Sequence, residues 1–243
     1  MPSNPPNSDD VLTLIDQRSP LAVVELVSAG DPSKALAAIR SAVVTLYWTR
    51  KDLPRVVTVS VAAMSVGLAK VGSLKDASAL NALLSEVKGL AYNLGSFTWL
   101  GWGEAGIAPG ATDIAIGLEA ARLNLNLAID LRKGDLPVAQ AYWLLGAQSI
   151  AAGRLDDALR YFDESASYAF KAEAPNEVAL ARAFAGLTGA AAVDATDDKR
   201  DIRRQQIRSA IALLIDSPNG AAFINQIRTA ATVFGWEGNL PVE

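Results

Sequence analysis

The feature that most constrains this chain is a short turn pattern that recurs along it. A glycine is followed by a leucine two residues later and an alanine five residues later, at residues 72–77, 134–139 and 153–158, with a looser copy at residues 30–35. Glycine supplies the left-handed backbone conformation that ends a helix. An aspartate or serine after it can cap the next helix, and proline suits that helix's first turn. Each copy therefore predicts a tight connection between two packed helices.

The breaks between the predicted helices fall at nearly regular intervals. A related Asp-Leu-Pro turn begins at Asp52, and later breaks occur at Pro175, Asp197 and Pro218. Most neighbouring breaks lie about 20 residues apart, and the longer gap from residue 72 to 134 has room for about three such units. Helices of this length with short connections pack antiparallel to their neighbours. The sequence therefore predicts an all-α fold, an antiparallel helix-pair solenoid of about ten helices.

Composition excludes several classes of active site. The 243 residues contain no cysteine and no histidine, which excludes disulfides, zinc fingers, iron–sulfur clusters, thiol nucleophiles and histidine-based triads. The sequence also lacks a phosphate-binding loop, a dinucleotide fingerprint and a nucleophile elbow. A net charge of −4 is not that of a general nucleic-acid binder. We expect a protein that is not an enzyme and that uses no metal and no cofactor.

The domain organisation follows from the distribution of proline, glycine and apolar residues. Residues 1–10 contain three prolines and no apolar run, which predicts a disordered tail. Residues 11–243 are expected to form a single helical-repeat domain, with a possible break near residues 101–111. The first residues do not resemble a secretory signal, and the longest uncharged window, residues 136–153, favours a buried helix over a membrane span. We expect a cytoplasmic protein with neither a membrane nor a nucleic-acid partner.

The stretch from Tyr142 to Phe162 resembles a tetratricopeptide repeat. The pattern of that family, an aromatic residue, Leu-Gly, a turn glycine, and then alanine and an aromatic on a second helix, is matched by Tyr142, Leu145, Gly146, Gly153, Ala158 and Phe162. The resemblance covers about one repeat, with weaker echoes elsewhere. It implies a tetratricopeptide-like scaffold or adaptor that binds a protein or peptide, or occasionally a small ligand, in a concave groove and catalyses no reaction.

In such a repeat the groove is lined by the first helix of each pair. On the matching face of this chain stand four candidate partner-binding residues, namely Gln140, Trp143, Ala147 and Ile150. This face is mostly apolar, which favours an amphipathic helix or an extended apolar segment as the partner. The alternative is that Trp143 is a core residue, since buried aromatic side chains usually serve packing.

A glycine-rich stretch with two tryptophans interrupts the helical rhythm. Trp99 and Trp102 stand among five glycines between residues 95 and 110, and glycine costs about 1 kcal/mol relative to alanine inside a helix. Large indole rings beside small residues suit an apolar interface or a ligand pocket. Trp99 and Trp102 are therefore candidate partner-binding residues, or the lining of an apolar pocket in a small-ligand sensor. The alternative is close helix packing in which the indoles fill the space that glycine leaves.

A basic stripe is the remaining candidate site. Arg200, Arg204 and Arg208 are spaced by four residues and share one face of a predicted helix, where they could bind phosphate or carboxylate groups. The alternative is a solvated helix face, offset by neighbouring aspartates. The first 110 residues carry few charges, which predicts a possible homo-oligomer or a permanent partner, through the N-terminal helices or the Trp99–Trp102 region.

Overall fold

The computed structural model describes residues 7–192 and 197–240. Within these ranges the chain is all-helical and contains no strand, and consecutive helices pack as antiparallel hairpins. This confirms the predicted fold class. The chain divides into two compact units, one of Met1–Thr98 with Glu119–Arg132 and one of Trp99–Leu118 with Lys133–Glu243. Each unit is described by itself.

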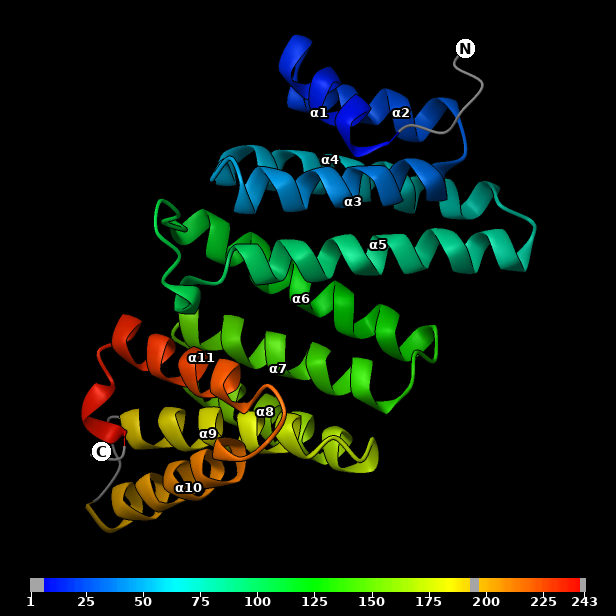
Figure 1. Ribbon diagram of the computed structural model, residues 1–243. Helices are drawn as coiled ribbons and strands as arrows, with labels where there is room; N and C mark the ends of the chain where they lie inside the picture. The colour runs from blue at the N-terminus through cyan, green and yellow to red at the C-terminus, as the bar shows by residue number, and fades with distance from the viewer. Residues whose placement is uncertain (1–6, 193–196, 241–243) are drawn as a thin grey trace. The chain divides into compact units, whose positions relative to one another are not determined.

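The first unit contains five complete helices and two short 3-10 turns, together with part of α6 (Ala111–Asp130) (Figure 1). They are α1 (Ser8–Gln17), η1 (Pro20–Ala22), α2 (Val23–Ala29), α3 (Pro32–Trp48), α4 (Leu53–Lys70), η2 (Val71–Ser73) and α5 (Ala77–Phe97). Helix α3 packs against both α4 and α5, which also pack against each other. Buried aliphatic side chains fill the core between these three helices. Examples are Leu36, Ile39, Val59 and Leu90.

Aspartates start three of these helices, as the turn pattern predicts. The side chain of Asp31 accepts hydrogen bonds from the backbone at the start of α3, and Asp52 and Asp76 do the same for α4 and α5. Such caps satisfy backbone N–H groups that have no partner inside the helix. The first helix begins at Ser8, inside the range assigned to a tail, because Asn7 and Asp10 form a reciprocal capping box. Residues 1–6 lie outside the described residues.

The second unit contains five further helices, and it begins with the turn η3 (Leu100–Trp102). The helices are α7 (Asp135–Ala151), α8 (Leu155–Lys171), α9 (Pro175–Ala191), α10 (Asp197–Ile215) and α11 (Gly220–Val233), followed by η4 (Glu237–Asn239). Helix α8 packs between α7 and α9, and α9 packs between α8 and α10. Helix α6 (Ala111–Asp130) contributes residues 111–118 to this unit and residues 119–130 to the first.

Glycines set the closest helix contacts in the second unit. A Cβ atom at Gly146 would lie 2.7 Å from the ring of Phe162, so the missing side chain is what brings α7 and α8 together. A Cβ at Gly186 would lie 2.7 Å from the side chain of Ile207, and one at Gly189 would lie 2.6 Å from Arg203. Helices α9 and α10 therefore approach closely at Gly186 and Gly189.

The segment between residues 72 and 134 differs from the prediction of three helices. It holds α5, which continues through Gly89 and Gly95, then η3, a non-helical stretch and α6. The predicted interruption near 101–111 coincides with η3 and residues 103–110, where Gly103 and Gly106 have positive φ angles of 57° and 82°. Glycine adopts positive φ angles at little cost in free energy. The glycines of this stretch therefore form a loop where a third helix was expected.

One helical segment in the described part of the chain, Leu53–Ser73, is long and apolar enough to span a membrane, with a mean hydropathy of 1.6. It comprises α4 and η2, and α4 packs against α2, α3 and α5.

Candidate binding groove

Most of the predicted partner-binding residues lie in the core of the second unit. Trp99 is only 1% exposed, and Trp143, Ala147 and Ile150 are also buried, whereas Gln140 is exposed and Trp102 is half-buried. The structure thus places the expected apolar face of α7 inside the protein, as the alternative interpretation of Trp143 had it. Of this face, Gln140 alone among the four candidates is open to a partner in this conformation.

An aromatic cluster gathers three of these candidates. The ring centroid of Trp99 lies 4.9 Å from that of Trp102 and 5.3 Å from that of Trp143, with both pairs edge to face. Phe184 of α9 meets Trp143 at 5.2 Å and 88°, and Phe234 at the end of α11 lies 6.5 Å from Trp99. Edge-to-face rings of this kind stabilise a core beyond the area that they bury.

The chain itself covers the face on which a groove was expected. Helix α11 packs on η3 and on α9, and η3 packs on α7. A Cβ at Gly103 would lie 3.1 Å from Thr229 and 3.2 Å from Val233 of α11, so the glycine lets the loop approach this helix. The ring of Trp99 in turn lies against Gly101. The candidate face of α7 is therefore covered by η3, and α11 packs on η3 in turn.

The basic stripe of α10 is engaged by nearby groups. Arg204 donates to the backbone oxygen of Gly238 at 3.4 Å and lies 3.5 Å from Asp201. Arg208 donates from Nε to the side chain of Gln205 at 2.9 Å, and Arg200 also has an interaction partner. The three guanidinium groups therefore do not form an open anion site by themselves, and anion binding here stays a prediction.

A groove lies instead along α8, α9 and α10. One hollow of about 440 Å³ is lined by Asp163, Ala166, Ser167, Phe170, Arg182 and Gln206. A second of about 520 Å³ is lined by Asp156, Leu159, Gly189, Ala192, Lys199, Ile202 and Arg203. In both hollows α8 and α10 supply the walls and α9 lies between them. We call these two hollows together the α8–α10 groove.

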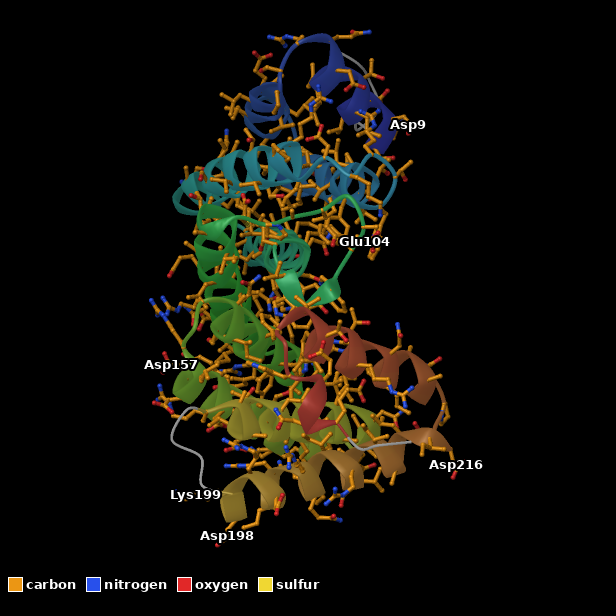
Figure 2. All side chains as sticks on the ribbon, turned by 90° about the vertical axis from the view of Figure 1, so that its left-hand side faces the viewer. Asp9, Glu104, Asp157, Asp198, Lys199 and Asp216 are labelled. Atoms are coloured by element: carbon orange, nitrogen blue, oxygen red, sulfur yellow. The ribbon has the colours of Figure 1, made fainter. Side chains whose placement is uncertain are left out.

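The sequence explains why this face is hollow. The α8 residues of the groove recur at intervals of three and four, from Asp156 through Asp163 to Phe170, so they share one side of the helix. Between the two walls, α9 contributes Gly189 and Ala192, which have little or no side chain. In the second hollow, these small residues between larger ones on α8 and α10 leave a channel. Figure 2 shows Asp157 and Lys199 at the same end of the unit, where α8 and α10 both begin.

Two large apolar side chains stand exposed on opposite walls of the groove. Phe170 on α8 is 73% exposed and Ile202 on α10 is 68% exposed. Phe170 also lines a third hollow of about 460 Å³ at the turn from α8 to α9, with Pro175 and Val178. Exposed apolar residues that gather at a groove with a polar rim mark interaction sites on soluble proteins.

The groove also holds charges that have no ion-pair partner. Among the residues described, neither the carboxylate of Asp163 nor the guanidinium of Arg182 takes part in a salt bridge, although both line the first hollow. The wall of α10 is fixed by hydrogen bonds: Arg203 donates to Gln206 at 3.1 Å, and Gln206 donates to the backbone oxygen of Arg182 at 3.1 Å. The first hollow thus combines a hydrogen-bonded α10 wall with charges that form no ion pair among the described residues.

A tyrosine cluster on α7 and α8 is closed by its own stacking. The rings of Tyr142 and Tyr168 are stacked with centroids 5.5 Å apart, and the ammonium group of Lys171 lies 4.4 Å from the ring of Tyr168. Burial raises the pKa of the Tyr142 phenol, and the charge of Glu164 raises it further. With rings this close, the cluster leaves no space for a ligand between them.

Sequence reasoning missed the residues that line this groove. Phe170 follows Ala169, which belongs to the buried side of α8 with Ala158 and Phe162, but it stands on the side that carries Asp163 and Ser167. An aromatic residue on the polar side of an amphipathic helix is a signal that could have been found. Ile202, between Lys199 and Arg203, is a second signal of the same kind.

No protein-family model matches the chain, and no curated protein matches it.

Proposed function

We propose that this protein is a non-enzymatic binding module, a scaffold or adaptor, which takes a helical segment of a partner protein into the α8–α10 groove. The observation that carries the proposal is the exposure of one large apolar side chain in each hollow, Phe170 on the α8 wall of the first and Ile202 on the α10 wall of the second. The tetratricopeptide-like motif from Tyr142 to Phe162 supports the same class of function by resemblance.

A helix suits the shape and chemistry of this groove. Its walls are two helices, α8 and α10, that run in the same direction on either side of α9. The two hollows follow one another along these walls, so the groove is elongated. An amphipathic helix can place an apolar ridge on such a floor and keep its polar sides at the rim. Residues such as Phe170 in a groove of this kind are typical anchors of binding energy. The occupant of our proposal is therefore an amphipathic helix of another protein.

The test is selection of displayed amphipathic helical peptides against the full chain. We expect selected peptides to lose at least about tenfold in affinity on Phe170→Ala or Ile202→Ala, because truncation of an apolar anchor costs about 1–2 kcal/mol or more. Ile215→Ala is the matched control, since Ile215 is also on α10 and is 63% exposed but lines neither hollow. Peptide anisotropy measures the affinities.

Two outcomes contradict the proposal. One is that selected peptides bind the Phe170 and Ile202 variants as tightly as the wild type. The other is that the wild type sediments as a dimer that Phe170→Ala dissociates, which means that a second copy of the chain covers the groove.

A second candidate function, a small-ligand sensor, rests on the indole groups of the aromatic cluster. The Nε1 atoms of Trp99 and Trp143 are buried, and neither donates to an acceptor among the described residues. Buried polar groups normally have a partner, so a small acceptor-bearing ligand inserted into the cluster supplies one. A metabolite or lipid that shifts the tryptophan emission of the wild type and not that of Trp99→Phe favours this function.

A further inference from the structure

We infer that the α8–α10 groove accepts its helix in one direction only, with a basic flank of that helix along α8 and an acidic flank along α9 and α10. This inference rests on the proposed function and deepens it, because it names the charge pattern of the partner.

The two sides of the groove carry opposite charges. On α8, Asp156 and Asp163 both line the groove, and a separation of seven residues places them two turns apart, about 10 Å along the same side of the helix. Arg182 comes from α9, the helix between the walls, and Arg203 comes from the α10 wall. The acidic residues thus follow the α8 wall, and the arginines lie on the middle helix and on the α10 wall.

These charges do not neutralise each other across the groove. In the described ranges, no salt bridge joins Asp156 or Asp163 to Arg182 or Arg203. Arg203 instead donates to Gln206 on its own helix. Elsewhere on α8, Asp157 does pair with Arg160, three residues along, so carboxylates on this helix find partners where one is in reach. Charges that remain open on both walls can pair with a ligand between them.

A helix seated in the groove presents one flank to each wall. If its apolar ridge rests on the floor between Phe170 and Ile202, basic residues on the α8 side meet Asp156 and Asp163, and acidic residues on the other side meet the two arginines. Reversing the chain direction exchanges the flanks, so that like charges face each other on both walls. Attraction in one orientation and repulsion in the other give specificity for direction.

The probe for this inference is a pair of peptides with the same composition. One is the tightest-binding peptide from the display selection, and the other is its isomer in which half of the lysines of one flank are exchanged with half of the glutamates of the other, so that neither direction of the isomer matches the charges of the groove. We expect the selected peptide to bind the wild type at least about fivefold more tightly than its isomer, because rim charges contribute modestly and additively. Added salt should reduce this preference and leave the Phe170 contribution largely unchanged.

Charge reversal in the protein provides the decisive comparison. The double variant Asp163→Arg, Arg182→Asp keeps the net charge but mixes the charges on both sides of the groove, because Asp156 and Arg203 are unchanged, so it should lose the preference for the selected peptide. The matched control, Asp157→Arg with Arg160→Asp, reverses a pair on α8 that lines neither hollow and should leave the preference unchanged. All four positions are on the surface or half-buried, and circular dichroism verifies that each variant keeps its helices.

The outcomes separate this inference from the proposed function. If both peptides bind equally well and both are lost on Phe170→Ala, the groove binds helices without reading charge, and the inference is wrong while the function stands. If the double variant keeps the wild-type preference, the inference is also wrong. If no helical peptide depends on Phe170, the proposed function itself is wrong.

Discussion

Opposite charges on nearby helices form an ion pair in the first unit, whereas two such charges in the second unit do not. In the first unit, Nε of Arg40 on α3 lies 3.0 Å from the Glu86 carboxylate on α5, and the Arg40 side chain crosses the helix at Gly89. In the second unit, Asp163 and Arg182 line one hollow and form no such pair among the residues described. Where opposite charges form an ion pair within the protein, they are not available to a ligand. Where they form none, they can pair with the charges of a partner.

The aromatic residues show the same contrast between closed and open surfaces. Trp48, at the end of α3, is 52% exposed, although its ring meets that of Phe97 edge to face. Trp143, near the middle of α7, is buried, and the rings of Trp99, Trp102 and Phe184 surround it. A tryptophan on the first helix of a pair is therefore exposed in the first unit and buried in the second. What decides its role is the element that packs over it.

The largest expected effect comes from removing a buried indole. Trp99→Ala should lower the free energy of unfolding by about 3–5 kcal/mol, because it leaves a cavity in the aromatic cluster. Trp48→Ala is the comparison in the first unit and should cost less than about 1 kcal/mol, since that side chain is half exposed. Urea midpoints followed by circular dichroism measure both. Equal losses would show that the contrast between the two tryptophans is wrong.

A smaller effect is expected from filling the contact between α7 and α8. Gly146→Ala adds a Cβ that would lie 2.7 Å from the Phe162 ring, and forcing the two helices apart should cost about 1–3 kcal/mol. Gly72→Ala is the control in the first unit, because a Cβ there meets nothing within 4 Å. Thermal unfolding should show a lower midpoint for the first variant alone. A stable Gly146→Ala protein would contradict the packing role of this glycine.

The contrast between paired and unpaired charges predicts a modest difference. Arg40→Met should destabilise the protein by up to about 1 kcal/mol, because it removes a partly exposed ion pair. Asp163→Asn should leave the stability unchanged, since no pair is lost. Chemical denaturation at low and high salt measures the difference, which salt should reduce. A larger loss at Asp163 than at Arg40 would mean that its carboxylate has a structural role.

The smallest expected effect is on stability at alkaline pH. Burial raises the pKa of Tyr92 in the first unit and of Tyr142 in the second. The unfolded chain therefore loses these protons first, and stability should begin to fall above about pH 10, the ordinary pKa of tyrosine. The variants Tyr92→Phe and Tyr142→Phe should each flatten this decline. Ultraviolet titration that shows both phenols ionising at the ordinary pH would contradict the two shifts.

The turns were predictable because their signals are local. Asp31, Asp52 and Asp76 cap helices through bonds that span two or three residues, and Gly134 and Gly153 take positive φ angles of 90° and 71° between helices. A sequence motif contains the whole of such an interaction. The fold class and the approximate helix boundaries follow from these positions alone.

The binding groove was less predictable because it depends on distant residues. The sequence left both a groove position and a core position open for Trp143, because its own helix pattern shows nothing of η3, which packs on α7. The second hollow of the groove depends on small residues between the larger side chains of α8 and α10, so it combines three helices. Phe170 could have been singled out by its position on a polar side, but the charges that accompany it come from other helices.

The return of α11 to the aromatic cluster has a consequence for the order of folding. Helices α7 to α10 pack mainly against the helix before or after them, and such local contacts form quickly. Helix α11 instead meets η3, whose residues are far earlier in the sequence. During synthesis Trp99 therefore leaves the ribosome long before Phe234. The aromatic cluster cannot form completely until α11 has been synthesised. Ribosome-bound chains that end before residue 220 carry an unfinished core.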